Sequence, residues 1–336
     1  MSDQENYMLK INNLRTSFFT PVGEVKALNN VTFAMKEGDV LGIVGESGSG
    51  KSVTSYSLLG LLAYPGKIVG GTIRFNGHEI EKKTEAEMRK IRGDEVSIIF
   101  QDPMTSLNPV YTVGNQIVEV IRLHTDKDAA AAQARAKELL ELVGINEAEK
   151  RLKQYPHELS GGMRQRVMIA IALACEPKLL IADEPTTALD VTIQAQILEL
   201  MIELKNKLGM SIIMITHDLG IVSNMCEKIA VMYAGKILEY GTVDEIFYTP
   251  RHEYTKGLLR SIPNLMDREH KKLVPIEGTP VDMLKPPKGC PFAPRCESCM
   301  RICLEHMPEV VHFSDTHYSA CWLNQKDEWT KESVEA

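Results

Sequence analysis

The stretch Val40-Leu41-Gly42-Ile43-Val44, followed by Gly45-Glu46-Ser47-Gly48-Ser49-Gly50-Lys51-Ser52, decides the fold. An almost entirely apolar run of this length is typical of a strand buried on both faces. The residues from Val53 to Leu62 predict a helix directly after the loop. The loop matches G-x-x-x-x-G-K-[ST] at every defined position, in the strand–loop–helix context that this motif requires. The sequence therefore predicts an α/β protein whose loop binds a nucleoside triphosphate.

Each part of this loop has a physical role in holding phosphate. The glycines let successive backbone N–H groups turn toward the β-phosphate, and the following helix adds its positive end. Lys51 reaches the β- and γ-phosphates, and the Ser52 hydroxyl is a ligand for Mg²⁺. The predicted ATP-binding residues here are Gly45, Glu46, Ser47, Gly48, Ser49, Gly50, Lys51, Ser52 and Val53.

Two carboxylates, Asp183 and Glu184, end the apolar run from Leu179 to Ala182. Ligands of α/β sheets bind at the carboxyl ends of strands, so both side chains are expected to face the phosphates. Asp183 is predicted to hold Mg²⁺, usually through a water molecule, and Glu184 to activate the attacking water as general base. The alternative, a pair of solvated loop acids, is weakened by the phosphate-binding loop elsewhere in the chain.

A second glycine-rich turn, Leu159-Ser160-Gly161-Gly162-Met163-Arg164-Gln165, lies between the loop and the acidic strand end. It predicts a second anion cradle at the start of a second helix. One nucleotide cannot occupy two cradles in a small domain, so the second is expected to face the nucleotide of a neighbouring subunit.

The set of motifs, in this order and spacing, resembles the ATP-binding cassette family over roughly the first three quarters of the chain. The resemblance implies that Ser160, Gly161, Gly162 and Gln165 form the signature that acts on the partner's ATP. It makes His217 the switch histidine that positions Glu184. It makes Gln101 a sensor of Mg²⁺ and the γ-phosphate. It places Asp190, after Ala188, in the loop that crosses the dimer interface. It also implies an aromatic that stacks on adenine, for which Phe18 is favoured and the adjacent Phe19 is the alternative.

Length, charge and apolar runs limit which classes of protein this chain can belong to. The 336 residues suit one large domain with an extension, and the net charge of −7 gives no electrostatic reason to expect nucleic acid as a partner. Residues 1–6 are acidic and polar and do not read as a secretory signal. The longest apolar runs fall short of the ~20 residues that cross a bilayer. We expect a cytosolic, peripheral protein that docks to membrane proteins at the cytoplasmic face.

The pattern along the chain predicts its domains. Residues 8–35 alternate as strands, 102–175 turn helical, and strands return at 178–182, 211–215 and 228–233. From about residue 250, prolines recur and apolar periodicity weakens. This pattern predicts a mainly parallel sheet covered by helices, and the family resemblance implies a P-loop NTPase with a RecA-like core, an antiparallel β subdomain and a helical subdomain at about 102–175. It forms a nucleotide-binding domain at 1–250, followed by a small Cys-rich extension at 251–336.

Several strings resemble the ATPase subunits of oligopeptide and dipeptide importers, and they extend the resemblance over nearly the whole chain. They are 102–114 after Gln101, 155–158 before the signature turn, 252–259, and 289–296, together with Ser261-Ile262-Pro263. Glu253 stands where that family usually has proline, which puts a rigid turn there in doubt. The resemblance implies a heterodimer with a second homologous ATPase, two membrane permease subunits and, indirectly, an extracytoplasmic substrate-binding protein.

Five cysteines gather between Cys290 and Cys321, and in a reducing cytosol such a cluster favours metal over disulfides. Cys296, Cys299 and Cys303 would share one face if they lay on one helix. The family resemblance selects Cys290, Cys296, Cys303 and Cys321 as ligands of a [4Fe–4S] cluster. The alternatives are a Cys₄ zinc site, a Cys₃His site that uses His306, His312 or His317, and reduced free thiols.

These features predict an ATPase that drives uptake of oligopeptides or dipeptides, with nickel as an alternative cargo. A third hypothesis is a soluble ATPase that acts on nucleic acid or ribosomes. The acidic charge and the importer-like tail argue against it.

Overall fold

The computed structural model describes residues 7–187, 189–261 and 275–325, which divide into two compact units. We call residues 8–35, 41–81 and 216–325 the loop unit, because it contains Gly45 to Ser52. Residues 36–40 and 82–215 form the helical unit.

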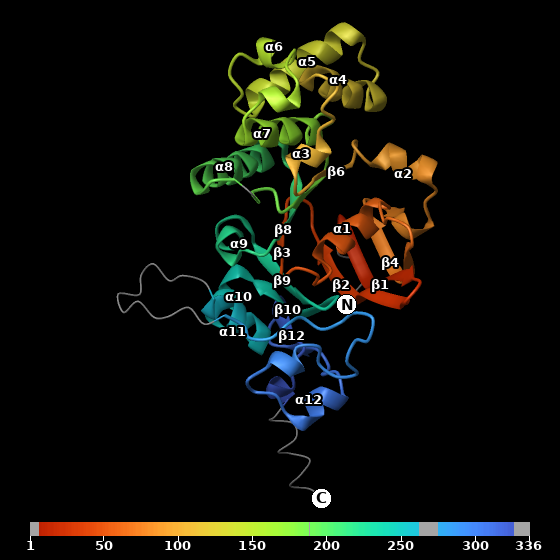
Figure 1. The fold of residues 1–336 in the computed structure, drawn as a ribbon, viewed down its shortest axis with the longest axis vertical. Helices are drawn as coiled ribbons and strands as arrows, with labels where there is room; N and C mark the ends of the chain where they lie inside the picture. Colours follow the sequence, from red (N-terminus) through yellow and green to blue (C-terminus); the bar gives the residue numbers. More distant parts are fainter. Residues whose placement is uncertain (1–6, 188, 262–274, 326–336) are drawn as a thin grey trace, which may run out of the picture. The chain divides into compact units, whose positions relative to one another are not determined.

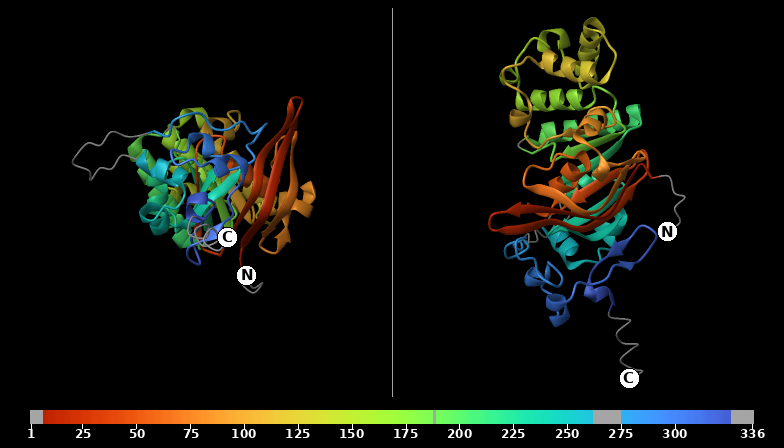
Figure 2. Two further views of the ribbon diagram at one scale, coloured as in Figure 1. Left: turned by 90° about the horizontal axis from the view of Figure 1, so that it is seen from below. Right: turned by 90° about the vertical axis from the view of Figure 1, so that its right-hand side faces the viewer.

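The first sheet of the loop unit is antiparallel, with strand order β2-β1-β4-β5 (Figures 1 and 2). Its strands are β1 (Leu9–Thr20), β2 (Gly23–Met35), β4 (Gly66–Phe75) and β5 (His78–Glu79). Leu9 and Ile11 of β1 are fully buried, and the alternating positions Lys10 and Asn12 are only half-buried. This is the two-residue period of a sheet with one covered face, so the predicted strand character of residues 8–35 is confirmed.

The second sheet of the loop unit has the neighbour order β11-β12-β10-β9-β3. Its strands are β3 (Val40–Val44), β9 (Lys228–Tyr233), β10 (Lys236–Thr242), β11 (Val311–His312) and β12 (Tyr318–Ser319). β3 runs parallel to β9, whereas the other neighbours are antiparallel. Every residue of β3 is buried, as its continuous apolar run predicts.

Helices α1 (Lys51–Leu59), α9 (Leu219–Met225), α10 (Val243–Tyr248), α11 (Glu253–Arg260) and α12 (Arg301–Glu305) belong to the loop unit. Its short 3₁₀ helices are η1 (Ile80–Lys82), whose last residue is in the helical unit, η3 (Ala293–Arg295) and η4 (Trp322–Gln325). The predicted helix after the loop is confirmed, although it begins at Lys51 and ends at Leu59, where Gly60 adopts a left-handed C-cap.

The helical unit contains the parallel neighbours β8 (Ser211–Thr216, its last residue counted in the loop unit), β7 (Leu179–Asp183) and β6 (Val96–Ile99). Its helices are α2 (Glu85–Ile91), α3 (Pro103–Ser106), α4 (Val113–His124), α5 (Ala129–Leu142), α6 (Ala148–Arg151), α7 (Gly161–Ala172) and α8 (Val191–Leu208), with the 3₁₀ helix η2 (Pro156–Glu158). The predicted helical segment 102–175 thus corresponds to α3 through α7. Figure 1 shows α4, α5 and α7 packed together.

Side-chain caps fix where these helices begin. Thr112, Asp128, Ser160 and Asp190 each accept a hydrogen bond from the backbone N–H three residues later, at the starts of α4, α5, α7 and α8. Such caps satisfy an amide that the helix itself leaves without an acceptor. Two of them, Ser160 and Asp190, are residues that the sequence marks as functional.

The predicted domain boundary at residue 250 falls between α10 and α11, and both helices belong to the loop unit. The chain beyond it adds to an existing core. Tyr254 is fully buried, and its ring lies 4.7 Å from that of Tyr233 and 5.2 Å from that of Phe292. The short strand β12 pairs with β10 and so extends the second sheet. The division at 250 itself stays a prediction.

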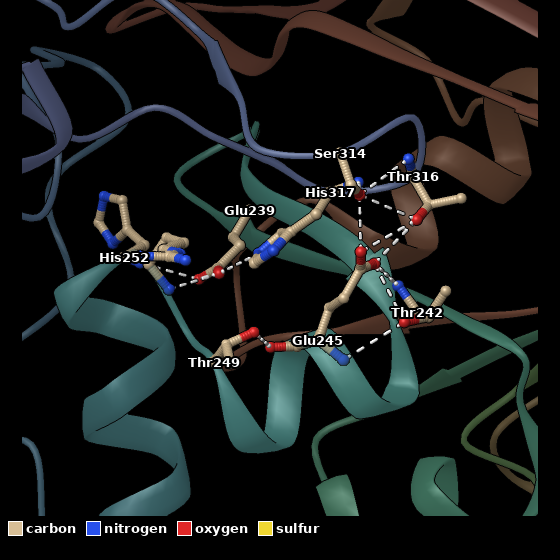
Figure 3. Close-up of polar contacts among 9 residues, drawn as sticks. Glu239, Thr242, Glu245, Thr249, His252, Ser314, Thr316 and His317 are labelled. Atoms are coloured by element: carbon tan, nitrogen blue, oxygen red, sulfur yellow. Dashed lines mark hydrogen bonds and ion pairs between the residues drawn. The ribbon is translucent and has the colours of Figure 1, made fainter.

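A buried carboxylate, Glu239 of β10, anchors this part of the chain (Figure 3). It accepts the backbone N–H groups of Arg251 at 2.6 Å and His252 at 2.9 Å, and its Oε1 lies 2.8 Å from Nε2 of His317. Nearby, Glu245 of α10 accepts the hydroxyl groups of Ser314 and Thr316. A buried carboxylate is stable only with such partners, so the network joins β10 to residues on both sides of α11.

Candidate nucleotide-binding site

Two positions of the phosphate-binding loop require glycine. Gly45 has φ 155°, and a Cβ there would lie 2.1 Å from the Met232 carbonyl oxygen. Gly50 has φ 102°, and its Cβ would lie 2.9 Å from the Ala27 carbonyl oxygen. Both conformations are rare for residues with a side chain. The glycines of the motif therefore permit the turn and also its close packing on neighbouring backbone.

Lys51, the first residue of α1, lies across the loop. Its side chain is buried, and Nζ donates to the carbonyl oxygens of Gly45 at 2.7 Å and Glu46 at 3.0 Å. Gly50 at the N-cap supplies no side-chain cap, so the first amides of α1 remain directed along the helix axis toward the loop. Ser52 and Val53 follow on α1 and are half-buried. A basic group and a helix N-terminus thus converge on one glycine-rich turn, the arrangement that binds phosphate.

The two aromatic candidates for adenine stacking differ in their surroundings. Phe18 of β1 is half-buried and pairs in register with Val25 and Gly66. A Cβ on Gly66 would lie 2.7 Å from Cε1 of the Phe18 ring, so that ring packs directly on the glycine. Phe19 is 48% exposed. The choice of Phe18 over Phe19 stays a prediction.

The acidic strand end is well ordered by its neighbours. Asp183 is the last residue of β7 and is buried. Glu184 adopts φ 47°, a left-handed conformation that non-glycine residues rarely take and that often marks functional sites. Its backbone N–H donates to Ile215 O at 2.8 Å. Its Oε2 accepts hydrogen bonds from Gln101 Nε2 at 2.9 Å and from Thr187 Oγ1 at 3.0 Å.

The structure thus brings together Gln101 and Glu184, which the sequence predicts as separate strand-end residues. Thr187 completes the group and was not singled out from the sequence. The available signal was a hydroxyl residue three positions after the predicted base, within the same turn, but threonines after strands are too common to be diagnostic.

The signature turn forms the start of α7. The Ser160 hydroxyl accepts the Met163 N–H at 3.3 Å, and Gly161 and Gly162 occupy the first helical turn. A Cβ on Gly162 would lie 2.9 Å from Cγ2 of Ile193 on α8, so the glycine lets the two helix starts approach. Gln165 is buried in α7, and Asp190 caps α8 through the Ile193 N–H at 3.0 Å. Ala188 lies outside the described residues.

His217 follows β8 and is exposed. It belongs to the loop unit, as does the phosphate-binding loop, and Asp218 beside it caps α9 through the Gly220 N–H at 2.7 Å. Gln101, Asp183, Glu184 and the signature turn belong to the helical unit. The predicted site residues therefore form two internally ordered groups, one on each unit.

Four cysteines of the loop unit line one small cavity of about 20 Å³, together with His252: Cys290, Cys296, Cys303 and Cys321. Burial raises the pKa of the Cys290 thiol to about 12 and that of Cys296 to about 11. Cys299 is exposed and does not line the cavity. Within residues 7–187, 189–261 and 275–325, no three His, Cys, Asp or Glu side chains are arranged as a metal ligand set.

The structure places three of these cysteines in separate segments. Cys296, Cys299 and Cys303 do not lie on a single helix: Cys296 follows η3, Cys299 lies in a turn, and only Cys303 is in α12. The chain makes a tight turn there, with the Cys299 N–H bonded to Cys296 O, and α12 begins only at Arg301. The ring of thiols around the cavity therefore arises from separate short segments.

The α/β fold and the loop geometry define a P-loop nucleotide-binding protein. Comparison with known proteins places it more narrowly. The family described as ABC transporter matches residues 28–187, and the family described as oligopeptide/dipeptide transporter, C-terminal region, matches residues 238–303.

Relatives and solved structures agree with both matches. The chain is 55% identical over 330 residues to the oligopeptide transport ATP-binding protein OppD of Bacillus subtilis. This match covers 98% of the chain and 92% of OppD. It is 52% identical over 320 residues to the dipeptide transport ATP-binding protein DppD of the same species, with 95% of each chain covered. The ATP-binding cassette MJ0796, in a dimeric post-hydrolysis state bound to ADP and Pi, has a TM-score of 0.64 and 28% identity. That match covers 70% of this chain and 99% of MJ0796.

The chain belongs to the ABC transporter ATPases, in the group of oligopeptide and dipeptide transport ATP-binding proteins, and it is an ATPase. None of the described helices is long and apolar enough to cross a membrane.

Proposed function

We propose that this protein is the ATP-hydrolysing subunit of an importer that carries oligopeptides or dipeptides across the cytoplasmic membrane. The observation that carries the proposal is the extent of the match to OppD and DppD, which includes both the nucleotide-binding motifs and the C-terminal region. The relatives' names state their cargo. The same cargo for this chain is our inference.

In this proposal the loop residues Gly45 to Val53 bind the phosphates of ATP, Phe18 stacks on adenine, and Lys51 turns from its carbonyl partners toward the β- and γ-phosphates. Ser52, Gln101 and Asp183 hold Mg²⁺, which would neutralise phosphate charge during cleavage. Hydroxyl, amide and carboxylate oxygens are the donors that this hard cation prefers, so the set fits the ion.

Glu184 is proposed as the general base that takes a proton from the attacking water, and His217 as the residue that contacts the γ-phosphate. The hydrogen bonds from Gln101 and Thr187 support this role, because they restrict where the Glu184 carboxylate can lie. The left-handed backbone of Glu184 restricts it further.

Ser160, Gly161, Gly162 and Gln165 are proposed to act on ATP bound by a second, homologous ATPase subunit, with Asp190 at the interface between the two. The small residues at the start of α7 support this reading, since a γ-phosphate can approach the first amides of the helix where Cβ atoms are missing.

Two membrane permease subunits are the proposed partners on the transport side, with a substrate-binding protein outside the membrane. The surface that supports docking surrounds α3 in the helical unit, where Met104, Val110 and Tyr111 are exposed apolar side chains within ten residues of Gln101. Exposed apolar groups that cluster in this way are typical of protein interfaces. The protein would then lie peripherally at the cytoplasmic face.

The cysteines that line the common cavity are proposed to hold a [4Fe–4S] cluster, with zinc as the alternative. Four thiols from separate segments line one cavity, which is the number of ligands that either group needs, and either group would cross-link those segments. Since the cavity measures about 20 Å³, the thiols must move apart to accept a cluster. Anaerobically purified protein should contain iron and acid-labile sulfide in near-equal amounts, and Cys303→Ser should lose both while Cys299→Ser keeps them. Zinc alone would overturn the cluster assignment.

The transport proposal is tested in cells that lack the native gene. Affinity-tagged protein should co-purify from detergent-solubilised membranes with two integral membrane proteins and a second ATPase, identified by mass spectrometry. Uptake of a radiolabelled tripeptide should be restored by the wild-type gene and not by Lys51→Ala. Uptake of radioactive nickel in place of the tripeptide, or recovery only with nucleic acid or ribosomes, would contradict the proposal.

A further inference from the structure

Arg295 is the last residue of η3, in the C-terminal region, and its side chain is only 4% exposed. It lies between Pro294 and Cys296, far in sequence from the phosphate-binding loop. Each of its five N–H groups has an acceptor. Nε donates to Glu277 O at 2.9 Å, one Nη2 hydrogen bond goes to Ile276 O at 3.1 Å, and one from Nη1 goes to the Tyr233 hydroxyl at 3.3 Å.

The two remaining hydrogen bonds go to the carboxylate of Glu46, the second residue of the phosphate-binding loop. Nη2 donates to Oε1 at 3.0 Å and Nη1 donates to Oε2, so the contact is bidentate. The Glu46 side chain is 27% exposed. A guanidinium held on all sides and paired through both of its ends fixes a carboxylate in position and direction, which an ammonium cannot do.

Glu46 is also held by its backbone. Its N–H donates to the hydroxyl of Tyr254 at 2.9 Å, and Tyr254 is a fully buried residue of α11. The carbonyl oxygen of the same residue accepts Nζ of Lys51 at 3.0 Å. One loop residue therefore receives contacts from the phosphate-binding lysine on one side and from two residues of the C-terminal region on the other.

The charge of Glu46 connects its contact with Arg295 to the affinity of the loop for nucleotide. The Glu46 carboxylate belongs to a loop that binds a triphosphate, and like charges repel each other more strongly where solvent is partly excluded. Arg295 neutralises that carboxylate and directs it away from the loop interior, toward η3. Loss of Arg295 would release the Glu46 side chain and leave its negative charge unpaired in a loop that binds phosphates.

We propose that Arg295, with Tyr254, is a positioning residue of the phosphate-binding loop: it holds Glu46 so that the loop keeps its nucleotide-binding conformation. The C-terminal region thereby completes the nucleotide site in addition to adding strands to the sheet. The inference rests on nucleotide binding by the loop and is independent of the cargo.

The test measures the binding of Mg²⁺-ADP to the full-length protein by isothermal titration calorimetry, because ADP reports on the loop without hydrolysis. Arg295→Met should raise Kd by about 10-fold or more, since a small displacement of binding groups has effects of this size. Arg295→Lys keeps the charge without the fork and should fall between wild type and Arg295→Met. Adding Glu46→Gln to Arg295→Met should recover part of the affinity, because it removes the unpaired charge.

Arg260→Met is the matched control. Arg260 also lies in the C-terminal region and pairs with Glu297 at 3.2 Å, but both side chains are largely exposed. The Kd of the Arg260→Met variant for ADP should equal that of the wild-type protein. Wild-type affinity in Arg295→Met, with a lowered melting temperature alone, would show that Arg295 only fastens the C-terminal region and would overturn the proposal. Equal weakening by Arg260→Met would overturn it as well. If Arg295→Met does not fold, Tyr254→Phe replaces it, because it removes the hydroxyl that accepts the Glu46 N–H: wild-type Kd in Tyr254→Phe contradicts the proposal.

Discussion

Thr187→Val tests whether the neighbours of Glu184 matter for hydrolysis. Valine replaces the hydroxyl by a methyl group of similar size, so the change removes the 3.0 Å hydrogen bond to Glu184 Oε2 and little else. A hydrogen bond to a charged group contributes about 1.5–3 kcal/mol. If that contribution holds the carboxylate where the attacking water is activated, its loss lowers kcat by about 10- to 100-fold, because about 1.4 kcal/mol corresponds to a factor of ten.

The assay is steady-state phosphate release by the purified transporter complex, with ATP affinity measured separately by calorimetry. The Kd for ATP should stay unchanged, because the lost contact is to the proposed base. Thr187→Ser keeps the hydroxyl and should hydrolyse ATP at close to the wild-type rate. Wild-type kcat in Thr187→Val, or an equal loss in Thr187→Ser, would refute the reasoning.

Three further changes follow from the same contacts. Glu184→Gln should bind ATP normally and show no turnover in a phosphate-release assay; normal turnover would refute Glu184 as the base. Glu239→Ala should lower the free energy of unfolding by about 3–5 kcal/mol in urea titrations, because it leaves the backbone N–H groups of Arg251 and His252 and the buried His317 without their partner; a loss below about 1 kcal/mol would contradict the anchor. Burial acts to raise the pKa of the Glu245 carboxyl, but hydrogen bonds from Ser314 and Thr242 hold that pKa below its usual value. Its stabilising effect should therefore be present at neutral pH and disappear as pH falls through that lowered pKa, so the difference in urea midpoint between wild type and Glu245→Gln should shrink at acid pH and not grow.

The sequence predicted what is determined locally. The strand from Val40 to Val44, the glycine loop and the following helix are contiguous, and each carries its own signal in residue type and period. The helix start at Ser160 was equally accessible, because a cap residue and its amide partner lie only three positions apart.

Contacts between distant segments could not be predicted in this way. The Glu46–Arg295 pair joins residues 249 positions apart, and no periodicity connects them. The addition of β12 to β10 depends on two residues of pairing, too few for a strand pattern. The cysteine spacing at 296–303 is compatible with one helical face, but spacing alone does not show that a turn follows Cys296 and that α12 begins only at Arg301. Local patterns therefore predicted candidate site residues, and the structure was needed to show which groups contact them.

The central claim is that each ATP is bound by two polypeptides, with the loop of one and the signature turn of the other. Ser160→Arg in the assembled transporter tests it most directly, because the substitution fills the space before α7 and leaves the residues of the phosphate-binding loop unchanged. We predict an unchanged Kd for ATP at this subunit's own loop and loss of hydrolysis at the site that its signature completes. Hydrolysis at the wild-type rate in both sites of that variant would contradict the account.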